Sequence, residues 1–483
     1  MTRNPAELGA YLRLPEPELL FDLSDTTQRH VHPLYGLLQF GPLSQSVMEV
    51  LSPQIRIAPI TPRAELAPLS GLIEELRRHH RPHERPNYLP EYPGMDRLFH
   101  REAAIAGPPA RVELAADLDD RLAASEKPYL VLADALSHAI AQLEMCRPDW
   151  DVVVIYLPAR WSAAFKGPED DFDLHDYVKA VAAMRAIPTQ LITEEKALRY
   201  GDRASVAWRL SIALYTKAGG VPWKMVPQEP ETAFMGISYA LRGDGTTGPR
   251  FVTCCSQVFD AAGVGLEFVA FDTERDRVTV VRDNPFLSRE QMRAVVASSL
   301  ALYIDRQAGR VPRRVVIHKQ TEFRGDELAG IYDALPLVPD IEAAQILEHP
   351  SWRGVLLNPA LIATADRRSE PDNYPVHRGT SLILDERDML LWSHGNAAAV
   401  TGGRGYLQGG KGIPRPIIVR RFAGRGAPTL LGSEILGLTK MNWNNDALYD
   451  VLPATLGFAS TLAHIVKRMP TIDRRTYPFR LFM

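Results

Sequence analysis

The sequence predicts an α/β protein with a parallel sheet followed by a second sheet that has an antiparallel edge. Strand-like and helix-like segments alternate between residues 50 and 225, as they do around a parallel sheet. Residues 151–157 form a continuous apolar run, which is typical of a strand covered on both faces. From residue 232 onward, strand-like runs follow one another through tight turns. With 483 residues, the chain is long enough for two or three domains.

The first part of the chain leads into the parallel sheet. Residues 1–49 contain short apolar pieces broken by Pro and Gly, which favours strands and turns rather than a separate domain. Residues 54–60 alternate like a strand and residues 66–80 have helical character, so together they begin a β-α unit. Helical periodicity returns at residues 130–145. These alternating elements predict a Rossmann-like arrangement.

Residues 171–223 contain two expected helices separated by a short strand. Asp171 or Asp173 can cap the first helix, which begins near Leu174. Pro188 disfavours helical geometry in the residue before it and therefore ends this helix. The remaining elements are a buried strand over residues 189–192 and a helix over residues 203–218 that is closed by Gly219 and Gly220.

Four polar side chains in this stretch can converge. His175 and Lys179 are four residues apart and share one face of the first helix. Gln190 lies in the strand, and Lys217 lies in the last turn of the second helix. If the helices pack across the strand, these groups surround a cavity suited to a dianion such as a terminal phosphate. The alternative is an ordinary solvated face, since a cation in a last helical turn also favours the helix dipole.

The C-terminal part shows a different pattern after about residue 225. Successive strands joined by tight turns suit the antiparallel edge of an RNase H-like sheet. The expected elements are strands over 232–240, 251–259 and 265–271, a helix over 289–306, a strand over 314–318 and a helix over 327–334.

The composition is that of a soluble globular protein. Hydrophobic residues make up 46% of the chain and charged residues 23%. We find no apolar run long enough to cross a membrane and no secretory signal at the N-terminus. The three cysteines, Cys146, Cys254 and Cys255, neither form a disulfide framework nor have the spacing of a zinc site. We therefore expect a cytoplasmic protein.

Charge is distributed unevenly along the chain. The formal net charge is −3, yet residues 401–483 contain 12 Lys and Arg against 4 Asp and Glu. A basic C-terminal region on an acidic chain suggests one face that meets polyanions. The alternative is that these cations neutralise acidic patches elsewhere in the fold or on a partner.

Several motifs together resemble Argonaute proteins. His175 and Lys179 form H-x3-K, residues 187–190 form I-P-x-Q, and residues 217–223 form K-x-G-G-x-P-W. This combination resembles the pocket for the guide 5′ end in the Argonaute MID domain, where Tyr or His, Lys, Gln and Lys are usual. Residues 37–42, LLQFGP, resemble a signature near the start of short Argonautes. Further counterparts in PIWI proteins are residues 379–393, 438–443, 452–455 and 480–483.

The resemblance covers nearly the whole chain and implies a domain order. Residues 1–49 would join the main body, residues 50–225 would form a Rossmann-like MID domain, and residues 226–483 an RNase H-like PIWI domain. There is no room for the N and PAZ domains that precede MID in long Argonautes. The chain therefore resembles a short prokaryotic Argonaute.

The resemblance also implies an inactive cutting centre. PIWI slicers hold two Mg²⁺ ions with carboxylates. The matching positions here are Ser238, Gln320 and Ser460, all neutral, and neutral side chains cannot offset two dications. Glu267 and Glu322 are near in sequence but do not replace a missing pair. Asp446 and Asp450 lie near the fourth position, so an alignment slip could hide one carboxylate but not three.

Further expectations follow from the resemblance alone. His175, Lys179, Gln190 and Lys217 would bind the guide's 5′ phosphate, with Mg²⁺ bridging it to the C-terminal carboxylate of Met483 beside Gln190. The guide would be a small RNA and the target DNA. Contacts to nucleic-acid backbones are assigned to Arg420, Arg421, Lys440, Asn442, Lys467 and Arg468.

A subunit that recognises nucleic acid but cannot cut it needs a separate effector. Short Argonautes that this chain resembles work with a second chain that carries an APAZ region fused to a sirtuin-like or TIR NADase, or sometimes to a nuclease. The pair would deplete NAD in defence against plasmids or phage. Two other classes stay open: an RNase H-type endonuclease that uses unrecognised carboxylates, and a Rossmann-type enzyme whose pocket binds a nucleotide phosphate. The second would need a Gly-rich loop after the first strand, and residues 58–63 have none.

Overall fold

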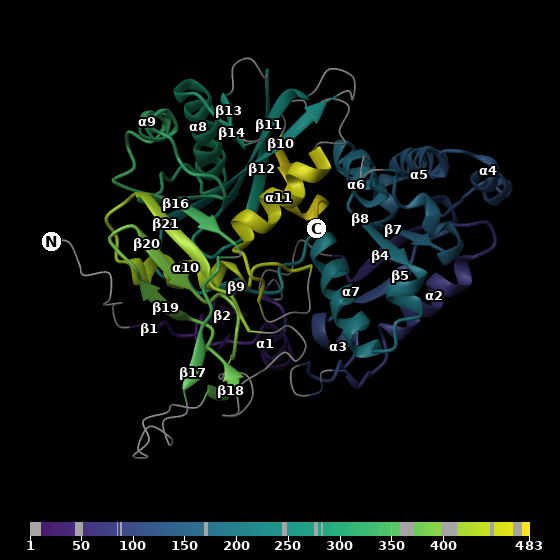
Figure 1. The fold of residues 1–483 in the computed structure, drawn as a ribbon. Helices are drawn as coiled ribbons and strands as arrows, with labels where there is room; N and C mark the ends of the chain where they lie inside the picture. Colours follow the sequence, from purple (N-terminus) through teal and green to yellow (C-terminus); the bar gives the residue numbers. More distant parts are fainter. Residues whose placement is uncertain are drawn as a thin grey trace.

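The computed structural model describes most of the chain in two packed parts, each built on its own sheet (Figure 1). The described residues are 11–43, 52–84, 86, 89–168, 172–243, 249–274, 279–281, 284–348, 350–357, 371–397, 413–444, 449–466 and 476–483.

The smaller sheet has five strands that all pair in parallel, as predicted for this part of the chain. Its order is β5-β4-β7-β8, and β6 pairs with β4. The strands are β4 (Gln54–Thr61), β5 (Glu102–Ile105), β6 (Val112–Glu113), β7 (Val152–Leu157) and β8 (Thr189–Thr193). β7 is buried along its whole length, which fits its continuous apolar sequence.

Helices cover both faces of this sheet because alternate strand residues point to opposite sides. Ile57 and Val154 face one core with α2 (Leu66–Glu75), α3 (Met95–Phe99) and α7 (Arg203–Lys217). Val153 and Ile155 face another with α4 (Leu118–Ala124), α5 (Pro128–Glu144) and α6 (Leu174–Met184). The predicted helix over 66–80 is shorter in the structure and ends at Glu75. Short helical turns are η2 (Pro108–Ala110), η3 (Arg147–Asp149), η4 (Ala159–Ala164) and the π-helix η6 (Glu194–Leu198).

The larger sheet has ten strands in the order β1-β19-β20-β21-β16-β15-β10-β11-β12-β22. The pairs β10–β15 and β15–β16 are parallel, whereas β10–β11 and β11–β12 are antiparallel. The antiparallel edge expected from the sequence is therefore present. The strands are β1 (Tyr11–Arg13), β10 (Thr232–Gly243), β11 (Pro249–Phe259), β12 (Gly265–Glu274), β15 (Arg314–Lys319), β16 (Asp340–Leu347), β19 (Thr380–Ile383), β20 (Asp388–Leu391), β21 (Ile417–Ala423) and β22 (Thr476–Pro478).

The larger sheet is also covered on both faces. Met235 and Ile317 pack with α8 (Arg289–Arg306) and α9 (Gly325–Ala334). Phe234 and Val316 face the opposite core with α10 (Pro428–Leu438) and α11 (Ala454–Val466). The small remaining strands are β2 (Leu19–Leu20), β3 (Arg29–His30) and β9 (Lys224–Met225), the pair β13 (Thr279–Val281) and β14 (Asn284–Phe286), and the pair β17 (Val355–Leu357) and β18 (Pro371–Pro375).

The N-terminal segment joins distant parts of the chain but differs from its prediction. β1 pairs with β19 and β2 pairs with β9, so strands are present as expected. Residues expected to be strand or turn instead form α1 (Pro33–Phe40). The ring Nδ1 of His32 accepts hydrogen bonds from the backbone of Leu34 and Tyr35 and caps this helix. Pro33 suits the first helical position, where no amide donor is needed.

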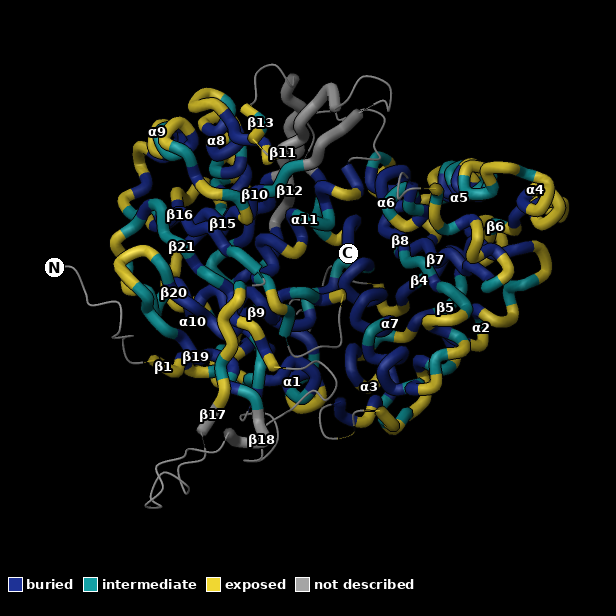
Figure 2. The backbone as a smooth tube through the Cα atoms, viewed as in Figure 1, coloured by how far each residue is buried: buried dark blue, intermediate teal, exposed yellow. Residues whose placement is uncertain are grey.

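The two parts meet where α6 packs against α11 and the last residues of the chain. Ala180 and Ala183 of α6 lie in one small core with Leu462, Phe482 and others, and the short turn η10 (Phe479–Leu481) completes it. Figure 1 shows the C-terminal end between the two parts, and Figure 2 shows that the elements around it are mainly buried. This junction brings the chain's end beside the candidate site.

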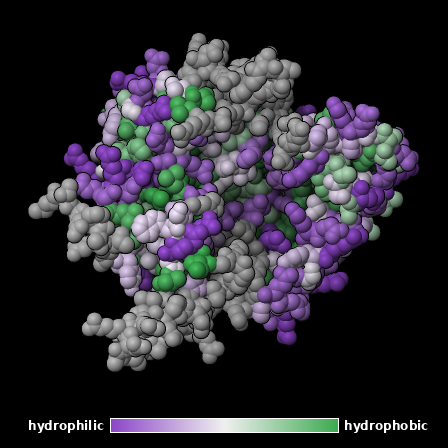
Figure 3. All heavy atoms as spheres, viewed as in Figure 1, coloured by the Kyte–Doolittle hydropathy of each residue, from purple (hydrophilic) through white to green (hydrophobic). Residues whose placement is uncertain are grey.

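Among the described helices, none is long and apolar enough to cross a bilayer. Figure 3 shows small, separate hydrophobic patches on a mainly hydrophilic face of the described part. Scattered apolar patches of this kind are ordinary on globular proteins.

Candidate functional site

Capping residues place the two helices that carry the predicted polar groups. The carboxylate of Asp173 accepts a hydrogen bond of 3.2 Å from the backbone of Asp176, so α6 begins at Leu174. The carboxylate of Asp202 accepts one of 3.1 Å from the backbone of Ser205 and caps α7. β8 lies between them in sequence, as predicted. Asp171, the other predicted cap, lies outside the described residues.

Lys217 and Gln190 form the centre of the site. Lys217 is the last residue of α7 and only 2% exposed, and its Nζ donates a hydrogen bond of 2.7 Å to Gln190 Oε1. Gln190 Nε2 donates in turn to the backbone oxygen of Leu191 at 3.0 Å. Burial lowers the pKa of Lys217 to about 7, because a charged ammonium loses its hydration there. The buried ammonium of Lys217 therefore has a neutral amide oxygen, and not a carboxylate, as its hydrogen-bond acceptor.

Lys179 lies just behind this pair. It is 1% exposed, and its Nζ donates hydrogen bonds to two main-chain oxygens, that of Thr189 at 2.6 Å and that of Met483. Burial lowers the pKa of Lys179 well below its ordinary value, and the charge of Lys217 lowers it further. The two buried lysines therefore both contact the start of β8, Lys179 through Thr189 and Lys217 through Gln190. Lys179 also contacts Met483.

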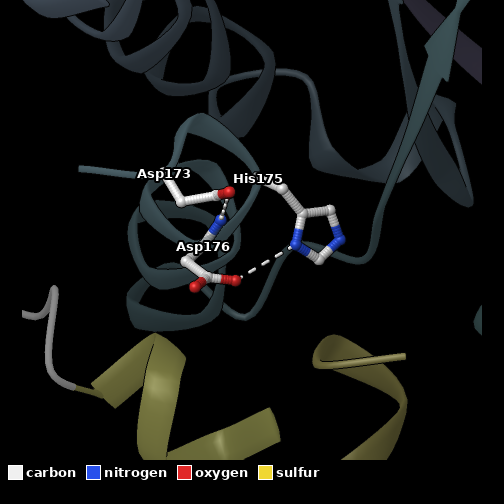
Figure 4. Close-up of side chains that lie close together, drawn as sticks. All are labelled: Asp173, His175 and Asp176. Atoms are coloured by element: carbon white, nitrogen blue, oxygen red, sulfur yellow. Dashed lines mark hydrogen bonds and ion pairs between the residues drawn. The ribbon is translucent and has the colours of Figure 1, made fainter. Parts of the chain in front are cut away.

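His175 stands apart from the two lysines. Its side chain is 51% exposed, and its Nδ1 lies 3.2 Å from a carboxylate oxygen of Asp176 (Figure 4). Asp173, His175 and Asp176 have ligand atoms within 4.8 Å of one another, the one such group of three found among the described residues. Their contacts are explained locally, because Asp173 caps α6 and Asp176 pairs with His175.

A cavity of about 450 Å³ opens beside these residues. His175 and Gln190 line it directly, whereas Lys179 and Lys217 are not among its lining residues, and Lys217 contacts it through Gln190. Its apolar wall includes Leu157, Phe165, Leu174, Leu191, Val206 and Leu210. A volume in this range suits a small organic ligand, so the cavity has room for more than a phosphate group.

Further cations border this cavity, and the sequence reasoning missed them. They are Lys166, Lys196 and Arg209. Lys166 and Lys196 are exposed, and Arg209 is partly buried with its guanidinium 5.7 Å from the Tyr200 ring. Arg209 and Lys217 are eight residues apart and so share a helix face, a signal that could have identified Arg209. The cavity is thus bordered by these cations and by the carboxylate of Asp173, as well as by apolar side chains.

The predicted magnesium ligands are already engaged. Magnesium takes oxygen ligands. Gln190 Oε1 accepts from Lys217, and the Met483 oxygen accepts from Lys179. Gln190 and Met483 together offer few oxygens for a magnesium ion, so a bound anion would have to supply most of the ligands. The magnesium assignment stays a prediction.

Ser238, Gln320 and Ser460 stand where the resemblance expects metal-binding carboxylates. All three lie on or beside elements at the face of the larger sheet that α11 covers. A Cβ atom at Gly236 would lie 1.9 Å from the backbone oxygen of Thr455, so α11 packs directly on β10. Ser238 is two residues further along β10 and points to the same side. Gln320 follows the end of β15, and Ser460 lies in α11. Ser238 and Ser460 are half-buried, and Gln320 is exposed.

One carboxylate near this face was missed in the sequence. Glu348 follows β16, and its carboxylate accepts a hydrogen bond of 3.4 Å from Gln320 Nε2. β15 and β16 are paired in parallel, so their ends meet at one edge of the sheet. No group of three potential metal ligands occurs here among the described residues. Asp446 lies outside the described residues, and Asp450 accepts a hydrogen bond from Asn442.

The proposed nucleic-acid contacts require correction. Lys440 is 2% exposed, and its Nζ contacts Glu16 at 2.6 Å and donates to the backbone oxygens of Pro17 at 2.6 Å and Val31 at 2.8 Å. It ties the N-terminal segment to the core and does not present its charge to a polyanion. The pKa of Lys440 is lowered to about 8 by burial, against the opposing effect of Glu16.

The two β21 arginines are also paired with acids. Arg420 makes a two-pronged ion pair with Asp388, at 2.8 and 2.7 Å, and Arg421 pairs with buried Glu342. Both charges thus have partners within the fold, while the Arg420 side chain is still 43% exposed, so the assignment of these two arginines as phosphate contacts stays a prediction. Lys467 and Arg468 lie outside the described residues, so that assignment is untouched.

Solved structures of Argonaute proteins share this fold. The TM-score is 0.62 with Aa-Ago carrying externally bound siRNA, at 15% identity over 98% of this chain and 56% of that one. It is 0.61 with A. aeolicus Argonaute, at 16% identity over 99% and 56%. It is 0.62 with Clostridium butyricum Argonaute bound to a guide DNA and a target DNA, at 13% identity over 96% and 54%. The chain thus spans just over half the length of these proteins.

At these identities the likeness shows the fold alone. No protein-family model matches the sequence, and no curated protein sequence does either. The match covers nearly all of this chain, so both sheets belong to the shared architecture. The mixed α/β fold therefore agrees with the MID and PIWI arrangement of Argonautes.

Proposed function

We propose that this chain binds a short guide strand by its phosphorylated 5′ end, pairs it with a complementary target and does not cut that target. The observation that carries the proposal is the pair of buried lysines, Lys179 and Lys217, of which Lys217 is hydrogen-bonded to Gln190 in the wall of a cavity that His175 also lines. The buried ammonium of Lys217, whose acceptor is the neutral amide of Gln190, favours an incoming dianion because a dianion supplies an opposite charge.

The cavity supports a nucleotide rather than a free phosphate as the ligand. Its volume of about 450 Å³ exceeds the needs of a phosphate, and its walls are largely apolar. Lys166, Lys196 and Arg209 lie on its border and can neutralise the backbone that leads away from the first nucleotide. A polynucleotide with a terminal phosphate meets all of these features at once.

The fold likeness supports a guided mode of recognition. One solved structure with this fold is bound to a guide DNA and a target DNA, and another carries siRNA. In such a mode base pairing reads the sequence, while the protein holds the backbone. We propose an RNA guide and a DNA target, on the resemblance to short Argonautes. Mg²⁺ beside the phosphate belongs to the same proposal and would draw most of its ligands from the guide.

The neutral residues at the cutting centre support recognition without cleavage. Ser238, Gln320 and Ser460 stand where the resemblance expects metal-binding groups, and Glu348 is one carboxylate where several are needed. We therefore propose that another chain supplies the activity. By resemblance, this is an APAZ-containing sirtuin-like or TIR NADase that acts with this subunit in the cytoplasm, in defence against plasmids or phage.

Purification from the native host tests the proposal. We expect the chain to retain short strands with 5′ phosphates and to copurify with an NADase chain. A Lys179→Ala, Lys217→Ala double variant should lose these strands, whereas Lys127→Ala, which changes an exposed lysine away from the cavity, should keep them. Equal retention by the double variant, or strands with 5′ hydroxyls, would remove the proposal.

A further inference from the structure

A second cavity, of about 260 Å³, lies where the N-terminal segment meets the start of β19. Both sides of this contact line it. The segment contributes Arg13, Leu14 and Glu16, and the loops on either side of β19 and β20 contribute Arg378, Asn396 and Ala397. The two cavities share no lining residue, so this one is a separate candidate site.

Asn396 supplies an unused acceptor at the wall of this cavity. The residue is 5% exposed, and its main chain is held on both sides, because its amide donates to Val376 at 3.0 Å and its carbonyl accepts from the amide of Arg378 at 3.0 Å. Its side-chain Oδ1 has no hydrogen-bond partner within the described structure. A buried acceptor without a donor loses its hydration uncompensated, so its place beside a cavity indicates a molecule that donates to it.

Cations outnumber acids beside the same cavity. Arg378 Nε donates to both carboxylate oxygens of Glu16, at 3.0 and 3.1 Å, and Lys440 Nζ lies 2.6 Å from one of them. Other acceptors of the Arg378 guanidinium are neutral, namely the Leu436 carbonyl and the Thr439 hydroxyl. One carboxylate thus serves two cationic side chains that are both fully buried, which leaves an excess of one positive charge.

The neighbouring charged groups that the structure describes do not remove this excess. Glu18 is the nearest further acid to Lys440, but its side chain is half-exposed and pairs with Arg29 at 3.7 Å. Arg13 is exposed on β1 and lines the cavity, so it adds another cation. A guanidinium matches a carboxylate through two parallel hydrogen bonds. An unused acceptor and an excess of positive charge therefore border one space.

We propose that this cavity binds a small carboxylic acid that carries a hydroxyl or amino group next to the carboxylate, as 2-hydroxy and 2-amino acids do. The carboxylate pairs with Arg13 and offsets the excess positive charge around Glu16. The hydroxyl or amino group donates to Oδ1 of Asn396. This ligand is not the guide strand, and its site lies outside the proposed function.

The volume and the walls of the cavity limit the ligand further. A cavity of about 260 Å³ is slightly smaller than the pockets of about 300 Å³ or more that hold drug-sized molecules. Leu14 and Ala397 give it apolar wall for a compact side chain. The Glu16 carboxylate also lines it and repels a second negative charge. A monocarboxylate is therefore favoured over a dicarboxylate or a phosphate dianion.

A ligand in this cavity would link two stretches that are distant in sequence. The Leu14 amide donates to the Gly379 carbonyl at 2.9 Å, next to the pairing of β1 with β19. A ligand that contacts both Arg13 and Asn396 adds a second connection between the same stretches. Binding should therefore slow hydrogen exchange over residues 11–16.

Mandelate is a suitable probe, because it combines a carboxylate, an adjacent hydroxyl and a compact apolar ring. Calorimetric titration of the full chain should detect its binding. Phenylacetate lacks the hydroxyl and mandelamide lacks the charge, so each should bind more weakly by about tenfold or more. Neither inorganic phosphate nor a 5′-phosphorylated RNA strand should compete with mandelate.

Two variants separate the two interactions. Asn396→Leu removes the acceptor at similar volume, and it should bind mandelate no better than phenylacetate, with the affinity for phenylacetate unchanged. Arg13→Gln changes an exposed residue that does not threaten folding, and it should weaken both carboxylates by about tenfold while leaving mandelamide unchanged. Arg310→Gln, which is exposed and outside the cavity, should behave as the native chain does.

Equal binding of the three compounds by the native chain, or binding of none of them, would overturn the assignment of this ligand class. Full mandelate affinity in both Asn396→Leu and Arg13→Gln would do the same. Displacement of mandelate by phosphate or RNA would place it in the cavity beside Gln190 and would also overturn the assignment. None of these outcomes touches the proposed function, which is tested by retention of 5′-phosphorylated strands.

Discussion

Lys217 Nζ donates a hydrogen bond of 2.7 Å to the side-chain oxygen of Gln190, with the lysine almost fully buried. The last turn of α7 supplies the ammonium, and β8 supplies the amide. Burying a charge opposite a neutral acceptor costs free energy that the fold must offset elsewhere. The arrangement is thus better suited to binding an anion than to stabilising the free protein, a common compromise at functional sites.

Lys217→Met should stabilise the free protein. The change removes a buried ammonium and keeps most of its apolar volume, so we expect a gain in the free energy of unfolding of about 1 kcal/mol or more at neutral pH. Denaturant unfolding would measure it. Lys127→Met, at an exposed site, should stay within about 0.5 kcal/mol of the native chain. A clear loss of stability in Lys217→Met would contradict the cost assigned to this charge.

The lowered pKa of Lys217 also predicts how the stability of the native chain varies with pH. The pKa of Lys217 is lowered from 10.5 in the unfolded chain to about 7 in the folded one. Between these values the unfolded chain binds the extra proton, so this contribution to stability is lost as pH falls from 10.5 to about 7. Lys217→Met should lack this component. Identical pH profiles for the two proteins would argue against it.

Lys179→Met should have the opposite effect on stability. Lys179 is the donor for the backbone oxygens of Thr189 and Met483, and its loss leaves two buried acceptors without a partner. We expect a loss of about 1–3 kcal/mol. Hydrogen exchange should become faster over residues 476–483, which pack against α6. Lys217→Met serves as the matched control and should retain slow exchange in that segment.

Lys440→Met tests a structural role against a nucleic-acid contact. Lys440 binds Glu16, and the charges of Arg378 and Lys440 overcome the effect of burial to lower the pKa of Glu16 to about 2. Removing one partner of a buried pair should cost about 3 kcal/mol. Proteolysis should then release the N-terminal segment more readily, and the salt dependence of guide binding should not change. A smaller salt slope with normal stability would restore the phosphate assignment.

Cleavage assays address the other class of function. With a guide, a matched target and Mg²⁺ or Mn²⁺, we expect no cut target, because Ser238, Gln320 and Ser460 offer no carboxylate. Metal-dependent cleavage that disappears in Glu348→Gln would instead identify a divergent nuclease. Glu126→Gln, at an exposed site on the smaller part, is the control for that variant.

Local signals explain which elements were predictable. The helix α6 follows from its cap at Asp173 and from Pro188, and α7 follows from its closing glycines, all within a few residues of each helix. The helix α1 was missed, although Pro33 at its first position and Gly41 after its end are ordinary helix signals. In the sequence, the Pro and Gly residues were interpreted as breaks between strands and turns, and the cap comes from the ring of His32, which is not a usual capping residue.

Long-range pairing explains what could not be predicted. Lys440 stands in a segment that resembles PIWI proteins, but its acid partner, Glu16, is near the other end of the chain. The spacing of four polar residues also predicted one shared site. It did not show that Lys179 and Lys217 are absent from the cavity lining, or that the ring of His175 pairs with Asp176. Burial of each side chain depends on packing between distant elements, which no local pattern reports.

The most direct measurement is the ratio of dissociation constants for one short RNA strand carrying a 5′ hydroxyl or a 5′ phosphate. For the native chain near neutral pH, we predict that the phosphate strengthens binding by at least about tenfold, or about 1.4 kcal/mol. In Lys217→Met the ratio should approach one while the protein remains folded. Equal affinity of the native chain for both strands would contradict the account.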